Sequence, residues 1–332
     1  MIASLTDPNA IREILTADGV TYETVRDILN AYFPNLPIYQ RLFKNEPHEF
    51  KQGTSLINWI YRARLVKPHQ SRWSKVSDID AIPKGKLHLI REHGRVNKRH
   101  QSIFYGSLNP HTACVETYAK GENMELILSG KPAMAVVGAW KAIAPIDFCQ
   151  IPLPVDYTRS FMVNDMIKAL NLRFQMDKIE KQAEHVRGMI NDEKAYNDLT
   201  FFSEAFARLE IDNHRQYMIS NYYADRVLGL IAGYEPTAPV EGIMYYSAPS
   251  SFQELNVAMQ PEMAARKLQF SHAYTMIIWH DPINGQNTWF PYEQGIRAVD
   301  GVIQWRKPSP TLHRGTVLPP AVGRPEARDE GA

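Results

Sequence analysis

The chain has few cysteines and almost no net charge. Only two cysteines, Cys114 and Cys149, occur among its 332 residues, too few for a disulfide framework or a four-thiolate metal site. We predict that both are buried, reduced thiols, Cys114 in a helix and Cys149 in a strand. The formal net charge is +1, which argues against a protein that mainly binds nucleic acid, because such a protein needs a broadly basic face.

Long apolar runs and several common binding motifs are also missing. No stretch approaches the length of a membrane span, and the opening MIASLTDPNAIREIL has an acid, a proline and an arginine where a signal peptide is apolar. We therefore expect a cytoplasmic protein without a membrane partner. The sequence contains neither GxGxxG nor a His/Cys/Asp cluster with metal-ligand spacing, so we expect neither a Rossmann site nor a bound metal.

The first 50 residues carry helix signals. Thr6, Asp7 and Pro8 favour a helix start, Thr21 can cap a second helix over TYETVRDILNAYF, and a third short helix is expected around IYQRLF. We predict an N-terminal helical extension over residues 1–50 that serves packing or dimerisation.

Residues 56–306 have strand texture at both ends and helical texture between. Aromatic and β-branched residues are frequent in LINWIYRARLV, SIFYGS, MELIL, AMAVVGAW and IDFCQIP, and again in GIMYYS, LNVAM, QFSHAYTMIIW and GVIQW. From about 157 to 233, apolar residues recur at three- and four-residue steps. This pattern predicts one α+β domain with a helical middle segment. Residues 307–332, full of proline, glycine and charge, predict a disordered tail.

The stretch GRVNKRHQSIFYGSLNPHTACVE, residues 94–116, concentrates candidate functional residues. The glycine before Arg95 permits a close backbone approach, and an arginine there can grip a phosphate or sit in a solvated basic loop. Tyr105 lies in a strand, where its ring can stack on a planar ligand or fill the core. Glu116 follows a capped helix start at Asn109 and Pro110, and it is either a site carboxylate or a surface residue.

Two further segments add polar candidates. In WIYRARL, Arg62 and Arg64 share one face of a strand and require anionic company, either acidic side chains or a bound diphosphate. In GIMYYSAPS, Ser247 ends a strand, where its hydroxyl can bind a ribose or an amide or simply form a turn.

Taken in order, these segments resemble the RES-domain family of toxins. The family pattern has an aromatic-Arg strand, a GR-x-N turn, a strand with Tyr, a helix with Ala and Glu, a G-I-x-Y-x-S strand and an N-x-A strand. Over residues 56–306, YRAR matches through Arg62, with Arg64 as the competitor, and GRVN through Arg95 and Asn97. FYGS matches through Tyr105, TACVE through Glu116, and GIMYYS through Ser247.

The resemblance implies an ADP-ribosyltransferase-like fold, with a split β-sheet core, flanking helices and an NAD cleft that needs no metal. It implies that Glu116 stabilises positive charge on the ribose or holds its 2′-hydroxyl, and that Tyr105 stacks on nicotinamide. Arg62 and Arg95 would hold the pyrophosphate, with Arg64 and Asn97 also at the NAD site, and Ser247 would bind the ribose or amide. In bacteria such toxins commonly pair with an antitoxin that blocks the cleft.

Three functions follow from this resemblance. The first is an NAD-consuming, toxin-like glycohydrolase or phosphorylase, and the second is a mono-ADP-ribosyltransferase acting on a protein. The third is a catalytically idle RES-like binding module. The sequence leaves open the acceptor (water, phosphate or protein), the antitoxin and whether the chain forms a homo-oligomer.

Overall fold

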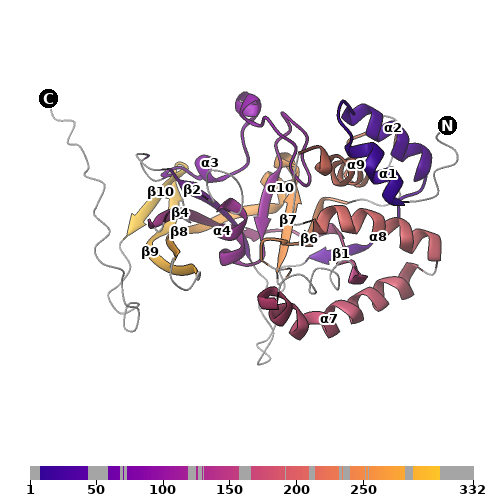
Figure 1. Cartoon of the computed structure of the whole chain (residues 1–332). Helices are drawn as coiled ribbons and strands as arrows, with labels where there is room; N and C mark the ends of the chain where they lie inside the picture. The colour runs from indigo at the N-terminus through magenta and orange to yellow at the C-terminus, as the bar shows by residue number, and fades with distance from the viewer. Residues whose placement is uncertain are drawn as a thin grey trace.

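The computed structural model describes an α+β protein built on one large mixed sheet (Figure 1). The described residues are 8–43, 59–67, 70, 73–118, 125, 129, 131–156, 166–190, 192–208, 214–231, 234, 240–250, 252, 254–280 and 287–306. The predicted tail and the capping residues Thr6 and Asp7 lie outside them. Within the described part of the chain, no helix combines the length and the apolar character needed to span a membrane.

Ten strands form the sheet. They are β1 (Gln40–Phe43), β2 (Trp59–Val66), β3 (Phe104–Ser107), β4 (Ala133–Ala142), β5 (Ile146–Gln150), β6 (Gly242–Tyr246), β7 (Leu255–Met259), β8 (Leu268–His280), β9 (Asn287–Val299) and β10 (Val302–Arg306). Their order is β1-β5-β6-β7-β3-β2-β4-β8-β9-β10. The β5–β6 pair is parallel, and the other named pairs are antiparallel.

The sheet is nearly divided in its middle. Strands β2 and β3 are matched only at Tyr61↔Ser107, whereas β2 follows β4 along its whole length, from Trp59↔Lys141 to Val66↔Met134. Each half therefore contains five strands. Glycine is needed at the junction, because a Cβ on Gly106 would collide with the Ile60 side chain.

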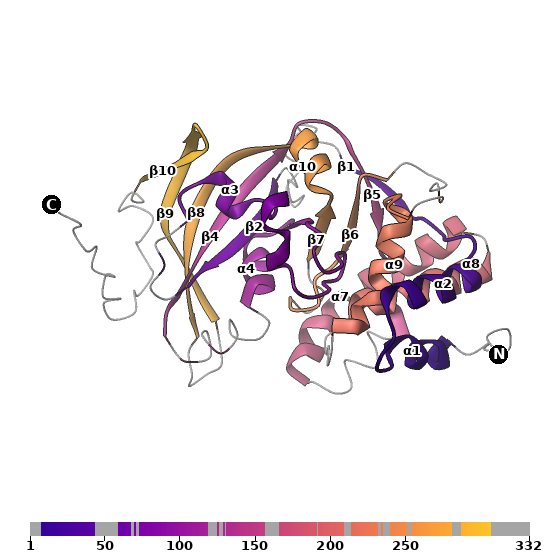
Figure 2. The ribbon, with the colours of Figure 1, turned by 90° about the horizontal axis from the view of Figure 1, so that it is seen from above.

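One half of the sheet is covered by helices from distant parts of the chain. These are α1 (Pro8–Thr16), α2 (Tyr22–Tyr32), α8 (Glu193–Ala207) and α9 (Met218–Val227), which gather beside β5 and β6 in Figure 2; α7 (Met166–Ile190) and the 3₁₀ turn η3 (His214–Tyr217) complete the predicted helical middle segment. Leu15, Leu29, Phe202, Tyr223 and Ile243 share one fully buried cluster. The N-terminal helices therefore build a common core with the middle helices and the sheet.

Helix α4 (Pro110–Tyr118) covers the other half on the same face. Successive residues of a strand point to opposite faces, and Val137 of β4 packs in the cluster under α4, whereas Val136 packs in the cluster on the far face. On that far face lie α3 (Val76–Ile79) and α10 (Pro261–Lys267), and the 3₁₀ segment η2 (Lys84–Leu89) precedes the GRVN turn. The site described below lies between α4 and the group of α8 and α9.

Most predicted elements are confirmed. Thr21 caps α2, accepting a hydrogen bond from Thr24 N at 3.3 Å, and the predicted strands are found as β2–β8 and β10. Both cysteines are buried and free, Cys114 in α4 and Cys149 in β5. Burial raises the pKa of each thiol to about 12.

Two expectations were wrong and one is mostly outside the described residues. IYQRLF does not form a third helix, because Gln40–Phe43 pairs as edge strand β1 with β5, and a turn this short is easily overridden by ladder bonds. Strand β9 was missed because Pro291 and Gly295 interrupt its pattern; the structure accommodates Pro291 beside a register shift. Of the expected strand MELIL, only Glu125 is described, and it is helical.

Candidate active site

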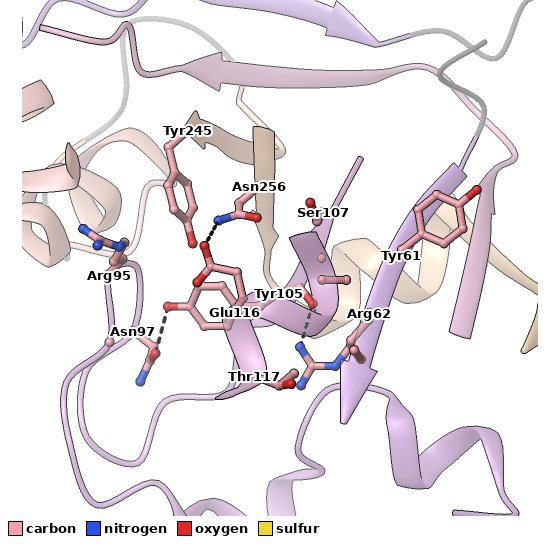
Figure 3. A pocket seen from close by; sticks show the side chains of 14 residues that line it. Tyr61, Arg62, Arg95, Asn97, Tyr105, Ser107, Glu116, Thr117, Tyr245 and Asn256 are labelled. Atoms are coloured by element: carbon pink, nitrogen blue, oxygen red, sulfur yellow. Dashed lines mark hydrogen bonds between the residues drawn. The ribbon is translucent and has the colours of Figure 1, made fainter. Parts of the chain in front are cut away.

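A cavity opens where the two halves of the sheet part, between β2, β3 and helix α4 (Figure 3). Its volume is about 290 Å³. The lining residues are Tyr61, Arg62, Ala63, Gly94, Arg95, Asn97, Tyr105, Gly106, Ser107, Ala113, Glu116, Thr117, Tyr245 and Asn256. The structure therefore brings Arg62, Arg95, Asn97, Tyr105 and Glu116, all predicted from the sequence, to one cavity.

Glu116 is fixed by a well-formed helix start and by two neutral donors. Asn109 caps α4 as predicted, since its Oδ1 accepts hydrogen bonds from His111 N at 2.8 Å and Thr112 N at 3.3 Å. One turn later Glu116 Oε1 accepts from the Ser247 hydroxyl and from Asn256 Nδ2, each at 2.6 Å. No described residue forms a hydrogen bond with Oε2. One carboxylate oxygen is thus immobilised and the other is left for a ligand.

Ser247 lies behind this carboxylate and not in the cavity wall. Its side chain is fully buried, and its Oγ donates to Glu116 while accepting from Ser250 N at 3.3 Å. We expected Ser247 to touch the ribose or amide of a ligand. In the structure it positions the glutamate instead, because its single hydroxyl proton is already used.

The structure separates the two arginines of YRAR. Arg62 lines the cavity, whereas Arg64 does not and donates to the Asp80 carbonyl at 2.9 Å. Arg62 donates to two backbone carbonyls, to Ile79 O through Nε at 3.0 Å and to Tyr105 O through Nη1 at 2.7 Å. Among the described residues no carboxylate pairs with it. Burial, then the neighbouring charge of Arg64, lowers the pKa of Arg62 to about 9.

Arg95 is clamped by the end of helix α8. Its guanidinium donates to Phe206 O and, at 2.6 Å, to Arg208 O, and the group lies 5.6 Å from the centre of the Tyr217 ring. The last carbonyls of a helix have no partner within it and carry partial negative charge. The described part of the chain offers Arg95 no carboxylate either, so it contributes positive charge to the cavity.

Tyr105 presents its ring to the cavity while its hydroxyl holds the GRVN turn. The hydroxyl donates to Asn97 Oδ1 at 2.8 Å and accepts from Val96 N at 2.8 Å, and burial raises its pKa above the usual value. The glycine before Arg95 allows this arrangement, because a Cβ on Gly94 would collide with Asn97 Oδ1. The close approach that we predicted for a ligand is made by Asn97. Asn97 is a structural partner of Tyr105 that also lines the wall.

Tyr245 and Asn256 are among the lining residues that sequence reasoning did not single out. Both lay inside segments that we had quoted, GIMYYS and LNVAM, and they are directly opposite each other in the β6–β7 ladder. Two signals were available for Tyr245: it is the Tyr of the G-I-x-Y-x-S pattern, and the two-residue period of a strand places it on the same face as Ser247. Asn256 follows from the N-x-A strand of the family pattern.

The electrostatics of the cavity favour an anionic ligand that carries a polar or cationic centre. Its fourteen lining residues include two arginines and one glutamate, a formal charge of +2 − 1 = +1. The described residues contain no group of three or more His, Cys, Asp or Glu side chains that could hold a metal. No family model matches this chain, and no curated protein matches it in sequence.

Proposed function

We propose that the protein is an NAD-consuming enzyme that cleaves the bond between nicotinamide and ribose. One observation carries the proposal. Glu116 is held through one oxygen by Ser247 and Asn256, in a cavity with two guanidinium groups that no described carboxylate neutralises. A substrate with a cationic reacting ring and an anionic diphosphate complements this site, since the ring matches the carboxylate and the diphosphate matches the guanidinium groups.

The reaction uses these charges directly. When the C1′–N bond breaks, nicotinamide leaves with the electron pair and positive charge develops on the ribose. A fixed carboxylate stabilises such a charge, as carboxylates do in glycoside hydrolysis, and it costs no reorganisation during the reaction. Glu116 Oε2 then either accepts a hydrogen bond from a ribose hydroxyl or takes the proton of the attacking acceptor. The acceptor forms the new bond to C1′.

The size of the cavity favours binding of one part of NAD inside it. A volume of about 290 Å³ is at the low end of small-molecule sites, which range over roughly 300–1,000 Å³. The nicotinamide riboside end fits this volume and the whole dinucleotide does not. The Tyr105 ring would stack on nicotinamide, Arg62 and Arg95 would hold the pyrophosphate, and the adenosine would lie outside.

The near-division of the sheet supports the finer fold assignment. An ADP-ribosyltransferase-like fold has a split sheet with its NAD cleft at the split, and here the halves meet at the single pair Tyr61↔Ser107 beside the cavity. The catalytic interpretation is favoured over an idle binding module, because an idle pocket has no need to hold a carboxylate between arginines. By analogy with RES proteins, we propose a cytoplasmic toxin whose partner is an antitoxin that covers the cleft.

Nicotinamide release from NAD by the purified 332-residue chain tests this proposal, with and without inorganic phosphate. Glu116→Gln keeps the shape of the site and should lower turnover by about 10²-fold or more, within the usual range for loss of a catalytic carboxyl. Glu193→Gln is the matched control, since Glu193 is exposed and pairs only with Arg187. Faster release with phosphate identifies a phosphorylase, and equal release identifies a hydrolase.

Two results would overturn the proposal. One is NAD left intact by the wild-type chain under all conditions, including in a cell lysate that supplies protein acceptors. The other is a Glu116→Gln variant as active as the wild type. Release that occurs only in the lysate, with ADP-ribose attached to a protein, would retain the bond cleavage and identify the transferase instead.

A further inference from the structure

The hydroxyl of Tyr245 is a buried polar group that has no hydrogen-bond partner among the described residues. Its side chain is 3% exposed and lines the cavity, and its ring packs against Phe206 at 5.6 Å between centroids. No hydrogen bond joins its hydroxyl to any described residue. Buried phenol groups normally find a partner, so this exception points to a ligand.

Three other tyrosines, one buried and two partly buried, show the contrast. The hydroxyl of Tyr105 donates to Asn97 at 2.8 Å, that of Tyr223 to Pro37 O at 2.7 Å, and that of Tyr246 to Gln182 Oε1 at 2.5 Å. These three hydroxyls hold the protein together. Only the hydroxyl of Tyr245, among these four, ends in the cavity without such a bond.

The register of the sheet places this hydroxyl beside the glutamate. Tyr245 of β6 is the direct partner of Asn256 of β7, and directly opposed side chains project from the same face a few ångströms apart. Asn256 in turn donates to Glu116 Oε1 at 2.6 Å. Figure 3 shows the hydroxyl end of Tyr245 directed toward the Glu116 carboxylate.

The phenol is protonated at neutral pH. Burial first, and then the negative charge of Glu116, raises the pKa of Tyr245 well above its ordinary value. It is therefore a neutral hydrogen-bond donor. The phenol is directed toward the Glu116 carboxylate, whose Oε2 forms no hydrogen bond with a described residue, so the two groups offer one acceptor and one donor to the same part of a ligand.

We propose that Tyr245 is a further catalytic residue of this site, donating a hydrogen bond to the 3′-hydroxyl of the nicotinamide ribose while Glu116 Oε2 accepts from the 2′-hydroxyl. This inference rests on the proposed function and makes it more specific. A vicinal diol fits an acceptor and a donor placed together, and holding both oxygens fixes the sugar as it flattens toward the oxocarbenium ion. The site then selects substrates with an unmodified nicotinamide ribose.

Tyr245→Phe tests the assignment, because it removes one oxygen and keeps the packing against Phe206. The control is Tyr246→Phe, whose hydroxyl lies on the other face of β6 and bonds to Gln182. Nicotinamide release is measured for both variants with NAD and with an analogue lacking the 3′-hydroxyl on the nicotinamide ribose. Thermal unfolding of both variants shows whether the fold is retained.

With NAD, Tyr245→Phe should lower kcat/KM about 10-fold, the upper range for one neutral hydrogen bond, and Tyr246→Phe should change it little. The wild type and Tyr245→Phe should turn over the 3′-deoxy analogue at the same rate, because this analogue lacks the oxygen that the Tyr245 hydroxyl would contact. A purely structural role would lower turnover of both substrates equally.

The inference is overturned if Tyr245→Phe matches the wild type on NAD, or if its loss persists on the 3′-deoxy analogue. In either case the wild type still consumes NAD, so the proposed function stands. If the wild type leaves NAD intact, the proposed function fails and this assignment fails with it.

Discussion

Two carboxylates in this molecule are each held through a single oxygen, but they differ in what holds them. Asp225 on α9 is 1% exposed, and its Oδ2 pairs with Lys98 at 2.7 Å and accepts from the Tyr22 hydroxyl. Glu116 accepts only from the neutral groups of Ser247 and Asn256. The first charge is neutralised inside the protein, and the second is oriented without being neutralised.

The arginines of the two regions both bond to neutral acceptors, but they differ in how many of these bonds they form and in where they lie. Arg226, beside Asp225 on α9, is 2% exposed and donates to Asn30 Oδ1, the Tyr222 hydroxyl and the Pro34 carbonyl, with its guanidinium 3.4 Å from the Tyr234 ring centre. These bonds join the N-terminal helices to α9. Arg62 donates hydrogen bonds to two backbone carbonyls at the cavity wall. The bonds of Arg226 therefore stabilise the fold, whereas the charge of Arg62 lies in the cavity wall, where a ligand can meet it.

The largest expected effect is on the structural side. Lys98→Met would leave Asp225 buried without its cation and should lower the free energy of unfolding by about 3 kcal/mol, the low end for a broken buried pair, since the Lys98 side chain is 32% exposed. Urea unfolding measures this loss. The control is Lys194→Met, whose 70%-exposed side chain pairs with Asp198 at 2.7 Å and should cost less than about 1 kcal/mol. Equal losses in the two variants would remove the distinction between the regions.

On the functional side, Arg62→Met should weaken binding of NAD about 10- to 100-fold, as expected for loss of a charge-assisted contact. The free energy of unfolding of Arg62→Met should fall less than that of Arg226→Met, because Arg62 bonds to two described acceptors and the more deeply buried Arg226 bonds to four. Calorimetric titration with NAD in the Glu116→Gln background and urea unfolding measure the two quantities. Unchanged NAD affinity would mean that Arg62 is structural.

Ser247→Ala should lower kcat about 10-fold with little change in KM, because the carboxylate loses one of two donors that hold it but still faces the substrate. The Cβ remains, so the buried turn keeps its shape. Ser203→Ala is the control, since Ser203 is also buried but donates only to Leu199 O within α8, at 2.8 Å. A rise in KM with kcat unchanged would indicate that Ser247 contacts the substrate after all.

Alkaline pH should affect NAD binding and stability through different groups. The pKa of Arg62 is lowered to about 9, so NAD binding should weaken as pH rises through about 9. The raised pKa of Cys114, Cys149 and Tyr222, each about 12, means that the folded protein keeps protons that the unfolded chain loses. Their contribution to stability is complete below the ordinary values near 9 and 10 and is lost as pH rises toward about 12.

Urea unfolding and NAD titration at a series of pH values separate these effects. The free energy of unfolding should decline above pH 9, while Arg62 by itself acts in the opposite sense, since its charge is expensive to bury below pH 9 and costs less above it. Stability that rises steadily from pH 9 to 11 would contradict the assignment of the buried thiols and phenols.

Sequence patterns were sufficient for most of the helices and strands and for five of the fourteen residues that line the cavity. Thr21 and Asn109 predict the starts of their helices, because a side-chain oxygen can accept hydrogen bonds from the first free backbone N–H groups without any tertiary partner. Aromatic and β-branched residues predict most of the strands of the sheet. Strand β1 was misread because four residues carry too little local signal, and their pairing with β5 depends on a segment more than one hundred residues away.

The predicted site residues were brought together, but several of their roles changed. Ser247 was expected in the cavity and lies behind Glu116, and Arg64 turned out to be bonded to Asp80 while Arg62 faces the cavity. Arg62 and Arg64 share one face of β2, so strand alternation cannot distinguish them. Their different positions depend on which distant backbone carbonyls each guanidinium reaches, and the sequence does not show this.

Local sequence signals were enough for most of the helices and strands, for the two buried thiols and for the choice of Arg62, Arg95, Tyr105 and Glu116 as site residues, because caps, strand alternation and burial of apolar side chains act over a few residues. Only the tertiary structure decided that Ser247 and Asn256 hold Glu116 through one oxygen, that α8 clamps Arg95, and that Tyr245 is left with a free hydroxyl. Each of these facts joins segments distant in the chain. A hydrogen bond between them exists only after the sheet has fixed both partners in place.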